Sequence, residues 1–222
     1  MRFARRGLHG QLVEIIARRI LSGEIGEGET LDLVALQHEL EVSLTAVREA
    51  LKVLSAKGIV DARQKRGTFV RPRADWNLLD SEVISWRLID KHDTTMLDNL
   101  HELRTIMEPR AARLAAERAT DDDIKALDAA LAEMTNGEGE AASADADLRF
   151  HRRLLAASRN ELLERLEVAV QADLAEQHRN GGQMAAGDAV KGHHAVLDAI
   201  RARDPDAAER AMHDLLYYQE AG

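Results

Sequence analysis

Apolar residues recur at helical spacing in the first third of the chain. Leu12, Ile16 and Ile20 share one face of a helix, and Val47 and Leu51 share the inner face of another. Two short runs of β-type residues follow, joined by a tight basic turn. The pattern predicts helices over about 8–22, 33–40 and 43–57 and strands over 59–63 and 68–71. Three helices and a two-stranded ribbon in this order are typical of a winged helix-turn-helix.

Beyond Pro72 the pattern becomes helical throughout. A polar stretch follows the proline, and we interpret residues 75–80 as a linker. Short loops between the later helices favour antiparallel neighbours and hence a helical bundle. The pattern predicts helices over about 80–89, 94–118, 120–135, 142–157, 160–178, 188–203 and 204–218, with loops at 136–140 and 180–187. The expected fold class is therefore mostly α: a winged helix-turn-helix domain over 1–74 and an all-α antiparallel helical bundle over 81–222.

Charge divides the chain into two unlike parts. The net charge is −9, which by itself argues against a nucleic-acid partner. Residues 1–74, however, hold 13 Lys and Arg against 9 Asp and Glu, a net +4, whereas the remainder carries −13. This asymmetry indicates that only the first domain faces a polyanion.

The composition excludes several classes of site. The chain has no cysteine, so disulfides and thiolate zinc sites are excluded. No apolar run is long enough to span a bilayer, and the first residues lack the apolar core of a signal peptide. We therefore expect a cytoplasmic protein without a membrane partner.

The candidate DNA-reading residues lie at the start of the third helix and in the turn between the two strands. In a helix-turn-helix the second of the paired helices enters the major groove by its N-terminal end. There an arginine can pair with guanine or phosphate, and hydroxyls can donate to phosphate. Basic residues of the wing add further phosphate contacts. The expected contacts are Ser43, Thr45, Arg48, Arg63, Lys65, Arg66 and Gly67.

The stretch VSLTAVREALKVLSAKGIV, followed by RQKRGTFV, resembles the signature of the GntR family of transcription regulators. This resemblance implies a repressor that binds a double-stranded DNA operator as a homodimer. Leu44 departs from the pattern, because it stands where the family usually has an arginine that contacts DNA. We expect this difference to alter affinity or operator preference.

The second part of the chain resembles the FadR subfamily and its all-helical effector domain, called FCD, over residues 80–216. Within it, the run from Trp76 to Trp86 and the run LRTIMEP are similar to repressors of D-galactonate catabolism. The resemblance implies a small carboxylate effector, such as the sugar acid galactonate.

A candidate metal site starts from Asp147 and His151. The two residues are four apart on one expected helix, so their side chains share a face. A carboxylate and an imidazole form a usable half of a divalent metal site, although such pairs also arise by chance. The resemblance to the family adds His193, within HHAVLDAI, as a third ligand and points to zinc.

The family completes its metal site with a histidine in the last helix, where this sequence has Leu215. His213 lies two residues earlier, about 200° away around a helix, so it cannot simply take that place. Three protein ligands can still hold a metal with water or an effector carboxylate completing the shell. Two alternatives stay open at this point: histidines that hydrogen-bond the ligand without a metal, and purely structural histidines.

Arg104 is the candidate effector-binding residue. It borders the inward stripe of its expected helix, and a partly buried guanidinium needs an anion, for which a carboxylate is the best match. In the resembling family the corresponding arginine faces the effector pocket. The alternative is an internal salt bridge with Glu108, one turn later.

The leading hypothesis is thus a ligand-controlled transcription regulator, not an enzyme, with no catalytic residues. One rival is a metal-dependent hydrolase on an all-α scaffold, since two histidines and a carboxylate can activate water. Against it, the sequence shows no nucleophile elbow or phosphate loop. Another rival is a DNA-binding dimer that responds to no effector.

Overall fold

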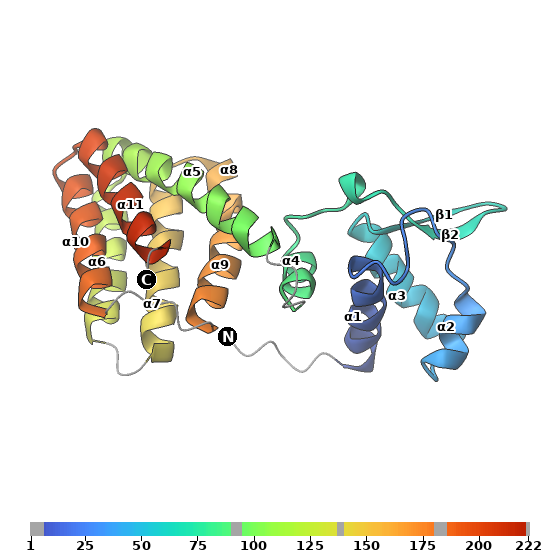
Figure 1. The fold of residues 1–222 in the computed structure, drawn as a ribbon. Helices are drawn as coiled ribbons and strands as arrows, with labels where there is room; N and C mark the ends of the chain where they lie inside the picture. Colours follow the sequence, from blue (N-terminus) through green and yellow to red (C-terminus); the bar gives the residue numbers. More distant parts are fainter. Residues whose placement is uncertain (1–6, 90–94, 137–139, 180–185, 221–222) are drawn as a thin grey trace. The chain divides into compact units, whose positions relative to one another are not determined.

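The computed structural model describes residues 7–89, 95–136, 140–179 and 186–220 (Figure 1). By its internal contacts the chain divides into two compact units, residues 1–94 and 95–222. As expected, the fold is mostly helical, with one small two-stranded sheet. Among the described residues, no helix has the length and apolar character needed to cross a membrane.

The first unit is a winged helix-turn-helix. Its elements are α1 (Leu8–Leu21), α2 (Leu33–Glu39), α3 (Leu44–Ala56), β1 (Val60–Arg63), β2 (Gly67–Val70), the 3-10 turn η1 (Arg73–Asp75) and α4 (Ser81–Leu88). The strands pair antiparallel, with Val60 opposite Val70 and Arg63 opposite Gly67. α1 packs against α3, where Ile16 and Leu54 are fully buried.

The segment that follows the wing belongs to this first core. Trp76, Val83 and Trp86 are buried in the same apolar cluster as the residues of α1 and α3. Gly58 allows the close approach, because a Cβ there would lie 2.4 Å from the backbone oxygen of Asp75, at a φ of +75°. The expected linker at 75–80 therefore lies inside the first unit, and the boundary between units falls at 94/95.

The second unit is an all-helical bundle. Its helices are α5 (Thr95–Arg118), α6 (Asp121–Asn136), α7 (Glu140–Ala157), α8 (Glu161–Arg165), α9 (Glu167–Arg179), α10 (Ala186–Arg201) and α11 (Pro205–Glu220). Figure 1 shows α6, α7, α10 and α11 side by side, and α5 packs against α7, α9, α10 and α11. The expected loops at 136–140 and 180–187 fall largely outside the described residues.

The bundle has a large and a small apolar cluster. Phe150, Leu154 and Leu197 are fully buried in the large one, and Met107 and Leu174 belong to the small one, which lies between α5, α7 and α9. The sequence predicted one continuous helix over 160–178, but the chain forms two. At Leu166 the backbone tightens to i→i+3 hydrogen bonds, from Leu166 to Leu163 and from Ala169 to Leu166.

Candidate functional site

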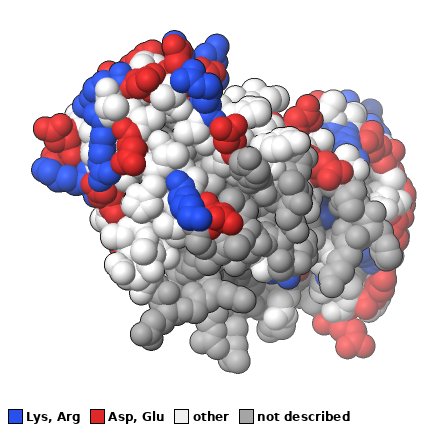
Figure 2. Space-filling view, turned by 60° about the vertical axis from the view of Figure 1, so that its left-hand side comes forward, with Lys and Arg blue, Asp and Glu red and all other residues white. Residues whose placement is uncertain are grey.

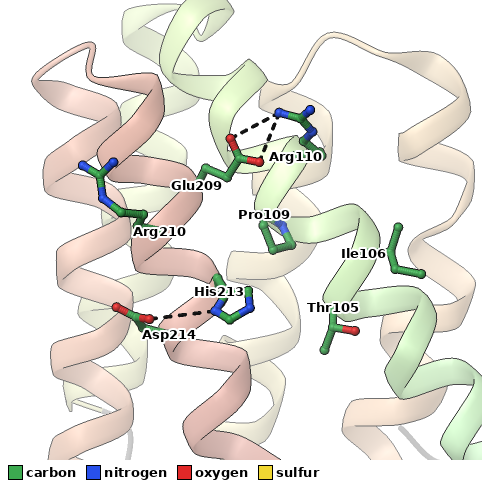
Figure 3. A pocket seen from close by; sticks show the side chains of 8 residues that line it. All are labelled: Thr105, Ile106, Pro109, Arg110, Glu209, Arg210, His213 and Asp214. Carbon is green, nitrogen blue, oxygen red and sulfur yellow. Dashed lines mark hydrogen bonds and ion pairs between the residues drawn. The ribbon is translucent and has the colours of Figure 1, made fainter.

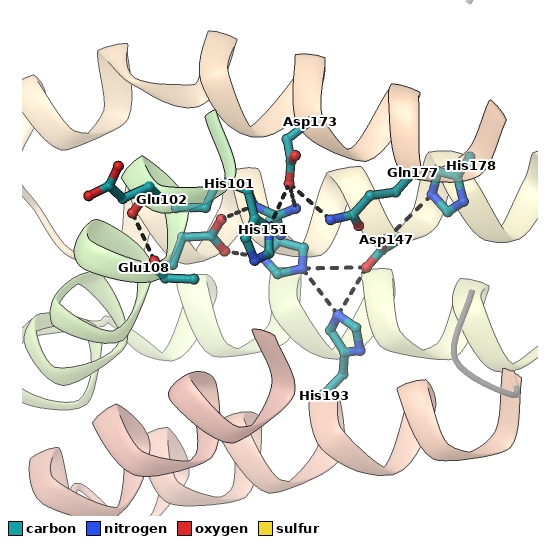
Figure 4. A network of polar contacts seen from close by, with 11 residues as sticks. His101, Glu102, Glu108, Asp147, His151, Asp173, Gln177, His178 and His193 are labelled. Atoms are coloured by element: carbon teal, nitrogen blue, oxygen red, sulfur yellow. Dashed lines mark hydrogen bonds and ion pairs between the residues drawn. The ribbon is translucent and has the colours of Figure 1, made fainter. Parts of the chain in front are cut away.

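Three buried side chains of the second unit meet in the middle of the bundle. Asp147 and His151 come from successive turns of α7, and His193 comes from α10 (Figure 4). Asp147 Oδ1 lies 3.0 Å from His193 Nε2 and 3.4 Å from His151 Nε2, and the two Nε2 atoms are 3.3 Å apart. The i, i+4 spacing thus places the two α7 residues on one face, as expected, and α10 supplies the third.

The outer nitrogen of each imidazole already has an acceptor. His193 Nδ1 donates to the carbonyl oxygen of Ala189 at 2.7 Å, and His151 Nδ1 donates to the carboxylate of Glu108. These contacts fix the ring orientations so that both Nε2 atoms point inward toward Asp147. Asp147 Oδ1 is buried and accepts no hydrogen bond within the described part of the chain. When both imidazoles are neutral, three electron-rich atoms therefore converge on one small volume.

Arg104 lies beside this cluster and is completely buried. Its Nε donates to Glu108 Oε1 at 2.6 Å, and its Nη1 donates to Asp173 Oδ2 at 2.6 Å. Its Nη2 is buried with no hydrogen-bond partner among the described residues. The salt bridge to Glu108, considered as an alternative from the sequence, is thus present, and a second carboxylate from α9 adds to it.

The buried charges do not balance. One guanidinium, that of Arg104, is buried in the same network as the carboxylates of Glu108, Asp147 and Asp173 and contacts the first and the last of them, so two negative charges remain when the imidazoles are neutral. In a low-dielectric interior such an excess needs a proton or a cation. Burial opposes the charged form of His151, but the charges of Glu108 and Asp147 outweigh it and raise its pKa to about 9.

The carboxylates respond in the opposite direction. Burial opposes ionisation of Glu108, but the charges of Arg104 and His151 lower its pKa to about 2. Burial likewise opposes ionisation of Asp147, and the nearby imidazoles of His151, His178 and His193 lower its pKa well below the usual range. Both groups are therefore ionised at neutral pH.

The expected DNA-reading residues all lie on the surface of the first unit. Ser43 caps α3, its hydroxyl accepting from the backbone nitrogen of Ala46 at 3.1 Å. Thr45 and Arg48 follow two and five residues later, in the first turn and a half of the same helix, and both are exposed. Arg48 pairs with no carboxylate of the described residues, whereas Glu49 beside it pairs with Lys52 at 2.7 Å.

The wing residues differ in how they are held. Arg66 stacks on the ring of Phe69, 3.7 Å from its centroid, and donates to the carbonyl oxygen of Gly28 at 2.9 Å. Arg63 lies 5.3 Å from the same ring. Lys65 and Gly67 form the exposed turn with φ of +71° and +83°, a backbone conformation that suits glycine best. The wing thus presents three exposed cations on a short, stiff ribbon.

The outer face of the bundle is chemically different from the buried cluster. In Figure 2 basic and acidic side chains lie next to one another on the surface. Among the ion pairs of the second unit, Arg201 contacts Asp128 and Asp198. Figure 3 shows an open pocket of about 400 Å³ between α5 and α11, with Arg110, Glu209 and His213 on its walls. None of the residues lining this pocket belongs to the Asp147–His151–His193 cluster.

Comparison with known proteins assigns both units. Residues 8–70 match the family model described as bacterial regulatory proteins, gntR family, and residues 99–217 match the FCD domain. The galactonate operon transcriptional repressor of Escherichia coli K12 is 34% identical over 206 residues, 90% of each chain. The regulator LutR of Bacillus subtilis is 33% identical over 202 residues, covering 87% of this chain and 90% of the relative. This chain belongs to the GntR family.

A solved structure agrees with this assignment. Streptococcus agalactiae GntR, 26% identical, covers 97% of this chain and 100% of its own, with a TM-score of 0.56. This GntR-family chain is therefore a transcription regulator with a winged helix-turn-helix and an FCD effector domain, and its relatives are regulators rather than enzymes.

Leu215, which stands where the resembling family has a histidine, is buried and packs onto Gly192. A Cβ at Gly192 would lie 2.7 Å from Leu215 Cδ1, so this glycine makes room for the leucine next to His193. His213, by contrast, is exposed on α11. The α11 side of the cluster is therefore apolar.

Several members of the polar network were not predicted from the sequence, among them two residues of α9. Asp173 and His178 lie on α9 and reach Arg104 and Asp147, respectively. The sequence places Asp173 and Gln177 one turn apart on one face of this helix, which is the only signal for Asp173, and it offers none for His178. Such a spacing does not reveal which distant residues the helix will cover.

Proposed function

We propose that this GntR-family protein is a repressor that binds operator DNA as a homodimer and is controlled by a small sugar acid. The sugar acid is suggested by the relative named as the galactonate operon repressor, which aligns over 90% of the chain. Two copies would place their α3 helices on the two halves of a palindromic operator. A two-fold symmetric dimer, the commonest form of homo-oligomer, matches the two-fold symmetry of such an operator.

In this proposal the exposed start of α3 reads the operator and the wing binds the flanking backbone. Arg48 supports the base-reading role because it is exposed and pairs with none of the described carboxylates. Ser43 and Thr45 supply hydroxyls at the helix N-terminus, and Arg63, Lys65, Arg66 and Gly67 form the wing surface. Arg66 is already oriented by Phe69, so little side-chain freedom is lost on binding phosphate.

A divalent metal, zinc by its ligands, would be held by Asp147, His151 and His193. The residues fit such an ion: their donor atoms all lie within 4.8 Å of one another, and the separations of 3.0–3.4 Å are close to the roughly 3.3 Å between ligands of a tetrahedral zinc with bonds of about 2.0–2.1 Å. A divalent charge also offsets the two excess negative charges of the network. When bound, the ion supplies a Lewis-acidic position for an oxygen of the effector.

Arg104 would bind the carboxylate of the same effector through Nη2, the guanidinium nitrogen that has no described partner. Glu108 connects the two parts, because one of its oxygens accepts from Arg104 and the other from His151. This juxtaposition of an incompletely bonded buried guanidinium with an Asp–His–His cluster is the single observation that carries the proposal. It suits a hydroxy acid, which offers a carboxylate and hydroxyl oxygens.

The functional test is a titration of operator DNA with galactonate. An operator would be selected from random DNA with the purified protein, and its affinity measured with and without galactonate by fluorescence anisotropy. We expect galactonate to change operator affinity in the wild type, and not in Asp147→Asn. If saturating galactonate and other aldonates leave the operator affinity of the wild type unchanged, control by a sugar acid is disproved. The protein would then be a DNA-binding dimer that responds to no effector.

The metal is tested separately from the effector. Zinc at about 100 times its Kd should add about 2.7 kcal/mol to the stability of the bundle. We therefore expect a chelator to lower the melting temperature of the wild type and to leave that of Asp147→Asn unchanged. His213→Ala is the matched control, since it removes an exposed histidine of the same unit. Equal chelator sensitivity of wild type and Asp147→Asn would disprove the assigned ligands.

A further inference from the structure

The two oxygens of Asp147 face different helices. Oδ1 faces His151 and His193, whereas Oδ2 lies 3.6 Å from Nε2 of His178, in the last turn of α9. Figure 4 shows His178 on the side of Asp147 opposite His193. His178 is outside the group of atoms that lie within 4.8 Å of one another, so its contact is with the carboxylate and not with the proposed ion.

The same helix also touches Arg104. Asp173 Oδ2 accepts from Arg104 Nη1 at 2.6 Å and from Gln177 Nε2 at 3.1 Å. The first half of α9 is anchored by buried Val170 and Leu174 in the small apolar cluster. Polar contacts add to this anchor: Asp173, between these two residues, reaches the proposed effector residue, and His178, in the last turn, lies near the proposed metal ligand.

No comparable polar contact reaches Asp147 from α11 within the described residues. Leu215 of α11 is almost fully buried and packs onto Gly192, the neighbour of His193 in sequence. Both imidazoles of the cluster have their Nδ1 atoms committed, to Glu108 and to the carbonyl of Ala189. Of the groups around the cluster, His178 is therefore the one placed to hold the second oxygen of Asp147.

We propose that His178 is a positioning residue that orients Asp147 for the metal, and that occupancy of the metal site is thereby coupled to the docking of α9 on the bundle. The inference rests on the metal site of the proposed function. At 3.6 Å the two atoms are slightly too far apart for a hydrogen bond, so the role needs a small approach of His178 toward Asp147 Oδ2. An N–H donated to that oxygen fixes the plane of the carboxylate and leaves the other oxygen directed at the ion. Loss of such an outer partner weakens metal binding about 10- to 100-fold.

Coupling of this kind is reciprocal. If the contact of His178 with Asp147 strengthens metal binding by a given factor, the metal must strengthen the docking of α9 by the same factor. Because Asp173 of α9 holds Arg104, a firmly docked α9 also keeps the guanidinium bound to Asp173. The state of the metal site thus reaches the proposed effector residue through one helix.

The first experiment measures metal affinity with zinc and cobalt alone. Full-length wild type, His178→Ala and His178→Gln would compete with a chromophoric chelator, and His194→Ala, an exposed histidine beside His193, serves as the matched control. We expect His178→Ala to bind about 10- to 100-fold more weakly, His178→Gln to recover part of the loss through its amide N–H, and the control to match the wild type. The cobalt absorption spectrum should keep its shape in His178→Ala, since no ligand is lost. An unchanged affinity, or a spectrum of lower coordination number, overturns the positioning role.

The second experiment measures hydrogen exchange of the α9 amides with and without zinc. In the wild type, zinc should slow exchange in the last turns of α9. The slowing should not exceed the ratio between the zinc affinities of the wild type and His178→Ala. In His178→Ala, zinc should have little effect on exchange. Exchange of α9 that ignores zinc in the wild type overturns the coupling. If the wild type binds neither zinc nor cobalt, the proposed metal site itself is wrong. If the wild type binds metal and His178→Ala binds it equally well, only the positioning role of His178 is wrong.

Discussion

The two units use the same kind of residue in opposite ways. In the first, Arg48 is exposed on α3 and pairs with none of the described carboxylates, whereas in the second, Arg104 is fully buried between Glu108 and Asp173. An exposed cation contributes little to folding but is available to a polyanion. A buried cation is part of the fold, because removing it leaves its partners unpaired. The comparison separates residues that act on DNA from residues whose loss first damages the domain.

The largest expected effect is on the buried side of this comparison. Arg104→Met would leave Glu108 and Asp173 buried without their cation, and we expect the free energy of unfolding of the second unit to fall by about 3–5 kcal/mol. Urea unfolding measures this change. Arg110→Met is the control, since Arg110 is about two-thirds exposed in its pair with Glu209 and should change stability by less than about 0.5 kcal/mol. Similar losses in the two variants would mean that Arg104 is no more structural than a surface arginine.

The second largest effect is expected at Arg48, the exposed arginine of the first unit. Arg48→Ala should weaken operator binding by about 1–3 kcal/mol while leaving the free energy of unfolding unchanged, since Arg48 contacts no carboxylate among the described residues. Anisotropy with the selected operator and urea unfolding of the same sample give both quantities. Arg149→Ala, in the second unit, removes a half-exposed arginine and should leave operator affinity unchanged. Were Arg48→Ala to bind the operator as tightly as the wild type, the assignment of α3 as the reading helix would fail.

Features set by neighbours in sequence could be predicted in both units. The Ser43 cap of α3, the glycine turn of the wing and the shared face of Asp147 and His151 all follow from spacings of four residues or fewer. The capping pair of Thr120 with Asp123, three residues apart, is of the same local kind and is present as reciprocal hydrogen bonds.

Features that depend on distant contacts could not be predicted. Asp173 is 69 residues from Arg104, and a periodic pattern does not say which helix will cover which. The polar stretch after Pro72 had the composition of a linker, yet Trp76 and the close approach of Gly58 to Asp75 join it to the first core. The network around Arg104 and the unit boundary therefore became visible only in three dimensions.

The ion pair of Lys57 with Asp80, partly buried in the first unit, gives the smallest test. Asp80 caps α4 through the backbone nitrogens of Glu82 and Val83, and both its oxygens lie 2.8 Å from Lys57 Nζ at the end of α3. Asp80→Asn keeps a capping oxygen but loses the charge, and Lys57 retains Glu82 at 2.9 Å. We therefore expect a loss of about 0.5–1 kcal/mol in the free energy of unfolding, well below that of Arg104→Met.

The pH dependence of the stability difference between wild type and Asp80→Asn tests whether the charge of Asp80 causes it. Burial opposes ionisation of Asp80, but Lys57 and the backbone of α4 outweigh it and lower its pKa below 3.8. A carboxylate with a lowered folded pKa contributes stability above its unfolded pKa and loses it as the pH falls through the folded value. The gap between wild type and Asp80→Asn should thus be constant near neutral pH and close below about pH 4. A gap that persists in acid would show that the side chain acts through its shape and not through its charge, and the first unit would then hold no counterpart to the buried ion pairs of the second.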